Sequence, residues 1–232
     1  MKASLDMVTK HTKKARDSRS DPAVSAVTRP LAPAQPLKRP RQGRSRFTVE
    51  AIYGAFVRIW ARDGPDAVTM RIVALESGFA VGTLYEYFPN VEALLSGYLR
   101  HLADTALARL DAELLKTSGT WQERLRRFVD VCCDTSACGY WDERMLQMEP
   151  LLARSGDYQR FFVQLERRWA SLFNTWDGPR PSRSEIAAIA LTVWGARRYR
   201  ERLDGMAGLD GWAEHLSMQC ILAVGACKTD QN

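Results

Sequence analysis

Residues 67–95, AVTMRIVALESGFAVGTLYEYFPNVEALL, contain two short helical patterns and the turn between them. Thr69 is suited to cap the first helix, and apolar or small side chains follow it at positions 70, 73, 74 and 77, which share one helix face. Gly78 is expected to end this helix, because glycine enters the left-handed region without a Cβ penalty. This stretch therefore predicts a short helix that stops at a tight turn.

A second short helix is predicted over residues 82–88, with Leu84 and Phe88 one turn apart and facing inward. Pro89 ends it, and Asn90 is suited to cap the next, longer helix. Two helices joined by a glycine-containing turn, the second with a free outer face, are typical of the helix-turn-helix. In that motif the second helix enters the major groove of DNA.

An amphipathic helix precedes this pair. Thr48 is suited to cap it, the dipeptide Gly64-Pro65 ends it, and its apolar residues follow the helical period: Ile52, Ala55, Phe56, Ile59 and Trp60. Three helices of this size enclose only a small core, so we assign the aromatic side chains to packing rather than to base stacking.

These segments resemble the DNA-binding domain of the TetR family of one-component bacterial transcriptional regulators. The matching stretches are IYGAFVRIWARDG (52–64), TMRIVALESG (69–78) and GTLYEYFPNVEALL (82–95), about a fifth of the chain by motif. The resemblance implies a homodimer, a palindromic operator in double-stranded DNA and a small-molecule effector. It also implies three DNA-binding helices followed by about six more, the last two of which pair with their mates in a second subunit.

The remainder of the chain independently predicts helices, because no run alternates every two residues for long enough to form a half-buried strand. The fold class is therefore all-α, with about nine helices. The later helices are predicted over residues 91–116, 121–138, 141–153, 157–176, 182–203 and 212–227. Apolar stripes from Ile186 to Trp194 and through Trp212, Leu216 and Ala223 would be shared between the core and the dimer interface.

Charge and composition divide the chain into three parts. Residues 1–46 hold twelve Lys and Arg against three Asp, a net charge of +9, whereas the whole chain carries +6. This segment is rich in Pro, Ala, Ser and Thr and lacks hydrophobic periodicity, so we predict a disordered basic arm there. The helix-turn-helix domain is assigned to residues 47–95, and a helical ligand-binding and dimerisation domain to residues 96–228.

Candidate DNA contacts come from the helix-turn-helix and the arm. Thr69 and Arg71 begin the first helix of the motif, where they can meet phosphate. The recognition helix supplies Thr83, Tyr85 and Tyr87. The arm supplies the cations Arg41, Arg44 and Arg46. Tyr85 matches the family's tyrosine. Ala80, Val81, Glu86 and Val91 depart from the family pattern, which removes two phosphate-binding cations and adds an anion. Either the arm restores this charge, or DNA binding is weak and needs a partner.

Candidate ligand contacts are the large side chains of the middle helices. Each one fills a core when considered alone, and together they can line an apolar cavity for an apolar or aromatic effector: Phe128, Met145, Phe162, Leu165, Trp169 and Trp194. Among the five cysteines, Cys132, Cys133 and Cys138 are expected to be buried and reduced, with a thiol sensor as the alternative.

Other classes of function receive little support. The sequence has no secretory signal and no apolar run of 18 residues, and an organellar transit peptide is the alternative for its Arg- and Ser-rich start. Gly-x-Ser-x-Gly, His-Glu-x-x-His, P-loop and Gly-x-Gly-x-x-Gly motifs are absent, so we expect neither an enzyme nor a metal or cofactor. The main hypothesis is a cytoplasmic repressor released by its ligand. The alternative is a ligand-independent DNA-organising or division-linked protein of the same fold, which a solvent-filled or absent cavity would favour.

Overall fold

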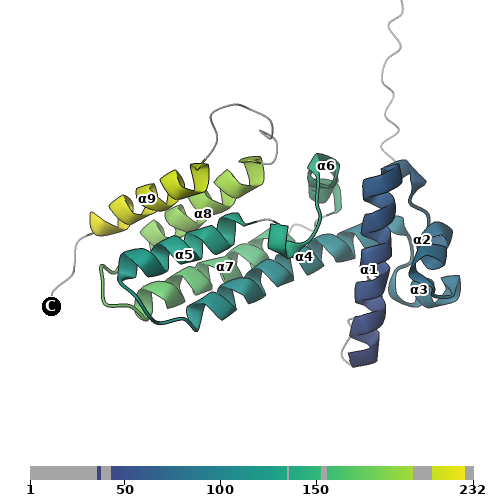
Figure 1. Ribbon diagram of the computed structural model, residues 1–232, viewed down its shortest axis with the longest axis horizontal. Helices are drawn as coiled ribbons and strands as arrows, with labels where there is room; N and C mark the ends of the chain where they lie inside the picture. Colours follow the sequence, from purple (N-terminus) through teal and green to yellow (C-terminus); the bar gives the residue numbers. More distant parts are fainter. Residues whose placement is uncertain (1–35, 38–42, 135, 153–155, 201–210, 228–232) are drawn as a thin grey trace, which may run out of the picture. The chain divides into compact units, whose positions relative to one another are not determined.

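The computed structural model describes residues 36–37, 43–134, 136–152, 156–200 and 211–227. Across these ranges it contains nine α-helices, two short 3-10 helices and no strand (Figure 1). The predicted all-α class is confirmed. The α-helices are α1 (Gly43–Asp63), α2 (Met70–Ser77), α3 (Val81–Tyr87), α4 (Val91–Leu114), α5 (Trp121–Cys133), α6 (Glu143–Leu152), α7 (Asp157–Asn174), α8 (Arg183–Arg200) and α9 (Trp212–Gly225).

The start of α1 differs from the prediction. The helix begins at Gly43, so four residues that we assigned to the arm are helical, and Thr48 lies inside α1 instead of capping it. Arg46 and Glu50, one turn apart, pair at 3.5 Å and support this early start. Residues 1–35 and 38–42 of the predicted arm lie outside the described residues.

The predicted helix over residues 121–138 is also interrupted. α5 ends at Cys133, and residues 136–138 form a separate 3-10 helix, η2 (Ser136–Cys138). Asp134 leaves the helical conformation and binds Arg109 of α4 through its carbonyl oxygen at 2.8 Å and its carboxylate at 2.7 Å. A tertiary ion pair therefore outweighs the local tendency to continue the helix.

Two clusters of buried apolar side chains form the interior. The N-terminal cluster is built from α1, α2, α3, the first half of α4 and Met145 of α6, and it includes Phe56, Leu84 and Phe88. The C-terminal cluster is built from the second half of α4 together with α5, α7, α8 and α9, and its largest members include Phe128 and Trp169. α4 supplies residues to both, with Leu94 and Leu95 in the first and Leu107 and Leu110 in the second.

Close packing of α4 against α1 requires a glycine. A Cβ atom on Gly97 would lie 2.7 Å from the Tyr53 hydroxyl oxygen and 2.9 Å from Phe88 Cε1, so a side chain there would push the two helices apart. Tyr53 and Tyr98 pack with ring centroids 5.6 Å apart beside this contact. α4 is thereby fixed to the helices that carry the helix-turn-helix.

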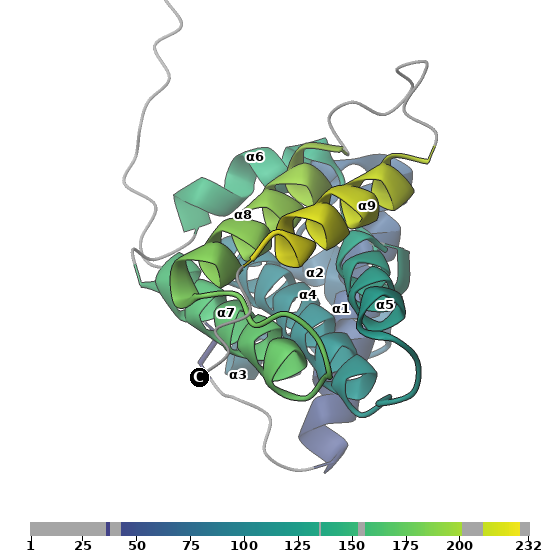
Figure 2. The ribbon, with the colours of Figure 1, turned by 90° about the vertical axis from the view of Figure 1, so that its left-hand side faces the viewer.

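In the second domain α5 lies against α4, α8 and α9, and α7 lies against α4 and α8. Figure 2 shows these helices from one end, with α5, α7, α8 and α9 in front of α1, α2 and α3. Of the helices in the described part of the chain, none is long and apolar enough to cross a membrane.

Candidate DNA-binding and ligand sites

Local sequence signals fix the helix-turn-helix as expected. The Thr69 hydroxyl accepts a hydrogen bond from Ile72 N at 3.2 Å and caps α2, and Gly78 closes α2 with φ +75°. Asn90 Oδ1 accepts from Ala93 N at 2.7 Å and caps α4. These three predictions are confirmed. Ala80 precedes α3 and makes no side-chain cap.

Helix α3 is held by its inner face. Leu84 and Phe88 are buried in the N-terminal cluster, as predicted, while Tyr85 on the other face is 49% exposed. Tyr87 is only partly exposed and packs beside Phe88 with ring centroids 6.3 Å apart. The Tyr87 carbonyl oxygen also accepts a hydrogen bond from Leu37 N at 2.7 Å, which joins the chain before α1 to the end of α3.

The other residues predicted to contact DNA are distributed over α1, α2 and α3. Thr69 and Arg71 are exposed at the start of α2, and Thr83 is half-buried on α3. The Arg46 side chain is 72% exposed in the second turn of α1, and Arg44 belongs to the first turn. Arg41 lies outside the described residues. The assignment of these residues to DNA contacts stays a prediction.

A charged cluster braces α1 against α2. Arg58 Nε binds Glu76 Oε1 at 2.8 Å, and Arg62 approaches the other oxygen of the same carboxylate at 3.6 Å. The hydrogen bond from Arg58 holds the pKa of Glu76 below its ordinary value. Arg62 also pairs with Asp63 at 2.9 Å, so two carboxylates balance the two guanidinium groups, and the cluster does not replace the cations missing at Val81 and Val91.

The predicted ligand residues do not gather in one place. Met145 is fully buried in the N-terminal cluster, because Asp142 anchors the start of α6 by accepting hydrogen bonds from Trp60 Nε1 at 2.9 Å and from Met145 N at 2.9 Å. Phe128 and Trp169 are fully buried in the C-terminal cluster with ring centroids 4.8 Å apart, and Phe162 packs against the same cluster. Of the six, Leu165 and Trp194 line the cavity described next.

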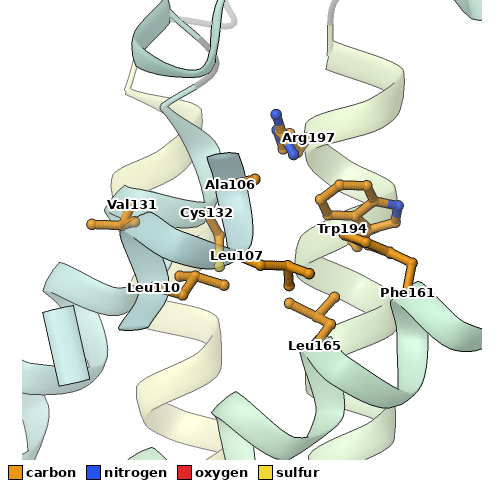
Figure 3. Close-up of a pocket in the computed structure, with 9 residues that line it drawn as sticks. All are labelled: Ala106, Leu107, Leu110, Val131, Cys132, Phe161, Leu165, Trp194 and Arg197. Carbon is orange, nitrogen blue, oxygen red and sulfur yellow. The ribbon is translucent and has the colours of Figure 1, made fainter. Parts of the chain in front are cut away.

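A small cavity lies between α4, α5, α7 and α8, where about 10 Å³ is available to the centre of a water molecule. Figure 3 shows its wall, with Leu107, Leu165 and Trp194 around the space and Arg197 at one end. The lining residues that the sequence did not identify are Ala106, Leu107, Leu110, Val131, Cys132, Phe161 and Arg197. The volume holds about one water molecule, far below the several hundred Å³ of typical ligand pockets.

A sequence signal for Arg197 did exist. On α8 the buried positions 186, 190, 193 and 197 follow the helical period, so residue 197 continues the apolar stripe. A charged residue at a core-facing position is costly unless it is paired, and it marks a site worth examining. The predicted stripe ends at Trp194 and therefore omits Arg197.

The cysteines favour the buried-hydrophobe interpretation over the thiol sensor. All five are free, and Cys132, Cys133 and Cys138 are buried. Burial raises the pKa of Cys132 and raises that of Cys133 to about 12. Oxidation proceeds through the thiolate, so these thiols are poorly reactive.

Helix α2 is capped by Thr69 and ends at Gly78, and helix α3 follows it with an exposed outer face. This arrangement defines a helix-turn-helix protein. Residues 52–97 match the family described as "Bacterial regulatory proteins, tetR family". An uncharacterized HTH-type transcriptional regulator from Haemophilus influenzae is 30% identical over 74 residues, which are 32% of this chain and 40% of that protein. The chain thus matches about two-fifths of the length of this curated relative.

A solved structure supports the fold. A TetR/AcrR-family regulator from Thermobifida fusca YX-ER1 aligns with a TM-score of 0.51 and 17% identity over 78% of this chain and 98% of its own. A transcriptional regulator from Rhodococcus sp. Rha1 aligns with a TM-score of 0.48 and 17% identity, over 76% of this chain and 94% of its own. The match to the tetR family of bacterial regulatory proteins covers the helices of the helix-turn-helix domain, residues 52–97. The family and these relatives are transcriptional regulators, not enzymes.

Proposed function

We propose that this protein is a DNA-binding transcriptional regulator, and within that class a repressor that a small ligand releases from a palindromic operator. One observation carries the DNA-binding part: α3 is anchored by buried Leu84 and Phe88 while Tyr85 stands half-exposed on its free face. This is how a recognition helix presents side chains to base edges and phosphates. A protein with this role works in the cytoplasm of a bacterium.

The test is operator selection from random duplex DNA with the full-length protein, followed by affinity measurements on the selected sequence. Tyr85→Ala should weaken binding by ~1–3 kcal/mol while the far-UV helix signal stays unchanged. Tyr85→Phe keeps the ring and removes the hydroxyl, so it separates apolar contact from hydrogen bonding. Unchanged affinity of Tyr85→Ala would mean that α3 does not dock on DNA as proposed.

We also assign the basic arm and Arg46 to phosphate. The positions corresponding to the family's usual cations are Val81, which is 44% exposed, and Val91. Non-specific affinity for duplex DNA depends on neutralised phosphates, so the arm is the main source of the missing charge.

Dimerisation is proposed through α8 and α9, with a different face from the one expected. Leu216 is only 7% exposed and belongs to the C-terminal cluster of its own subunit, whereas Leu191, Met218 and Leu222 are 57%, 46% and 66% exposed. These three apolar side chains lie on the outer faces of the last two helices and need a cover.

Leu222→Arg should therefore give folded monomers that bind a palindromic site poorly. Light scattering measures the mass, and circular dichroism checks the fold. Leu216→Arg is the contrasting variant, because it places a charge inside the C-terminal cluster and should impair folding itself. A Leu222→Arg protein that stays dimeric would move the interface elsewhere.

Ligand release is supported by α4, which contributes to both clusters and touches both the cavity and the DNA-binding helices. A ligand must prefer the DNA-free arrangement, and coupling of ~1–3 kcal/mol is typical of such linkage. The small volume of the cavity favours the alternative, a DNA-organising protein without a ligand. Operator binding that no small molecule alters would support that alternative.

A further inference from the structure

Arg197 is buried, and none of the described residues serves as its counter-ion. Its residue exposure is 7%, and its Nε atom is buried with no hydrogen-bond partner. Among the described residues no carboxylate lies within ion-pair distance of its guanidinium, whereas the neighbouring Arg198 pairs with Glu149 at 2.5 Å. A buried cation is normally paired, so Arg197 stands out on α8.

Two indole rings hold this guanidinium. Its central carbon lies 4.7 Å from the ring centroid of Trp194 and 5.8 Å from that of Trp141. Such contacts stabilise a cation through the electron-rich ring faces, but they supply no hydrogen-bond acceptor, and Nε of Arg197 has none. The side chain is therefore held in place while its strongest binding capacity, bidentate donation to a carboxylate, is unused.

The cavity wall beside Arg197 is otherwise apolar. Leu107, Leu165 and Phe161 line it, and burial raises the pKa of Cys132 so that its thiol stays uncharged there. No carboxylate belongs to this wall. A ligand that suits both parts of the site combines one anionic group with an apolar body.

Side chains, more than backbone, limit the size of the site. Trp194 and Phe161 pack with ring centroids 4.5 Å apart, and both are only partly buried, so they form the part of the wall nearest solvent. Leu107 and Leu165 are buried deeper in the wall, so a ligand larger than one water molecule would enter only if the ring of Phe161 or Trp194 rotated away. A ligand that replaces this ring contact recovers apolar burial and brings an acceptor to Arg197.

We propose that the cavity between α4, α5, α7 and α8 binds an organic monocarboxylate, with Arg197 as the residue that binds the carboxylate and Trp194 and Phe161 enclosing the apolar body. This inference rests on the proposed ligand-responsive function and names its ligand class. Occupancy at Leu107 and Leu110 would act on α4, which continues into the N-terminal cluster.

The test uses the full-length protein and a panel of carboxylates with neutral partners. Benzoate and phenylacetate represent aromatic acids, hexanoate and decanoate represent aliphatic acids, and the corresponding amides lack the charge. At least one acid should raise the thermal midpoint of the wild-type protein, by ~3–6 °C at about ten times its Kd, and its amide should not. Whether the aromatic or the aliphatic acids stabilise the protein identifies the apolar body of the ligand. If no acid exceeds its amide, the inference fails.

Variants at Arg197 then locate the effect. Arg197→Met should lower the affinity for the active acid by ~10–100-fold, and Arg197→Lys, which keeps the charge but loses the planar fork, should lower it less. Without ligand, Arg197→Met should be at least as stable as the wild type, because it removes an unpaired buried charge. Arg198→Met removes the same charge one residue away and should keep the ligand-induced shift relative to its own midpoint. Equal affinity in all four proteins would overturn the proposal, and the Lys variant decides if the Met variant does not fold.

Operator binding separates this inference from the proposed function. An acid that stabilises the protein through Arg197 and also releases the selected operator supports both. Operator binding with no acid-specific stabilisation overturns the carboxylate site and leaves the DNA-binding function standing. Acid-specific, Arg197-dependent stabilisation of a protein that binds no operator supports the site and overturns the function.

Discussion

The helices α1, α2 and α3 differ from the helices of the second domain in the number of buried polar side-chain atoms that lack a hydrogen-bond partner. Among the described residues of α1, α2 and α3, no side-chain nitrogen or oxygen is buried without a hydrogen-bond partner, although Trp141 Nε1, beside the N-terminal cluster, is in that state. The second domain holds Trp169 Nε1 and Arg197 Nε in that state, and Arg197 also lines the cavity. Each such group reduces stability by comparison with a paired one.

This difference separates two tasks. A recognition helix must be presented in one geometry, and tight packing without voids provides it. A domain that answers a ligand needs an alternative arrangement of nearly equal free energy, and unpaired polar groups beside a void reduce the gap between arrangements. The three predictions below test whether the two regions differ in this way.

The largest expected difference concerns packing. Phe56→Ala in the N-terminal cluster removes a fully buried ring and should lower the free energy of unfolding by ~3–5 kcal/mol. Phe161→Ala removes a half-buried ring at the cavity wall and should cost only about 1–2 kcal/mol. Urea denaturation of both variants measures the difference. Equal losses would show that the two interiors are packed alike.

Helix caps should, in contrast, behave alike in the two regions. Asn90 caps α4 through one hydrogen bond of 2.7 Å, and Thr120 caps α5 in a capping box in which Glu123 Oε2 accepts from Thr120 N at 2.7 Å. Asn90→Ala and Thr120→Ala should each lower stability by ~1 kcal/mol, because each frees an amide group at a helix start. The matched replacements Asn90→Ser and Thr120→Ser keep a capping oxygen and should lose less. A loss far above this at one site would show that its cap also sets the packing of its region.

The smallest expected effect is on how the free energy of unfolding decreases at acidic pH. Burial raises the pKa of Glu113, but hydrogen bonds from Lys116 and Arg127 outweigh it, and the pKa lies below its ordinary value. Because the pKa is lower in the folded state, this stabilisation is present above the unfolded pKa of about 4.3 and is lost as the pH falls through the folded pKa. Glu113→Gln should therefore show a shallower loss of stability between about pH 5 and pH 3.

Glu76 in the N-terminal region is the matched control for this measurement. Its side chain is 25% exposed against 5% for Glu113, and its pKa is lowered by the hydrogen bond from Arg58. Salt screens exposed pairs more than buried ones, so 0.5 M NaCl should remove the difference between wild type and Glu76→Gln. The difference for Glu113→Gln should persist. Identical salt responses would contradict the assignment of Glu113 as the shielded carboxylate.

The sequence predicted the N-terminal domain in more detail than the second domain. Thr69, Gly78 and Asn90 act locally, through hydrogen bonds and backbone conformation within a few residues, so their roles can be derived from neighbours in the chain. The end of α5 depends on Arg109, 25 residues away from Asp134, and the position of Met145 depends on Trp60 through Asp142. Such contacts are set by the tertiary arrangement, which periodicity does not encode.

The same limit applies to the faces of the last helices. Periodicity identified the apolar stripe of α9, but it did not say that the side of Leu216 faces its own subunit while Leu222 remains exposed. On α8 the buried stripe continues to Arg197. Because arginine is charged, a search for apolar residues at the helical period does not assign this position to the core. A period locates a helix face, and only the packed fold shows what covers that face.

The length of α4 has a mechanical consequence. Leu95 in the N-terminal cluster and Leu107 at the cavity are twelve residues apart, about 18 Å along the axis at 1.5 Å per residue. If the helix tilts as a stiff lever by ~5° about Leu107, Leu95 moves by about 1.5 Å. In a two-fold dimer the opposite displacements add, so the recognition helices would change their separation by up to ~3 Å against a half-site spacing of about 34–36 Å. Hydrogen bonds to bases weaken over a few tenths of an ångström, so in the proposed operator complex a rotation of a few degrees would break such contacts.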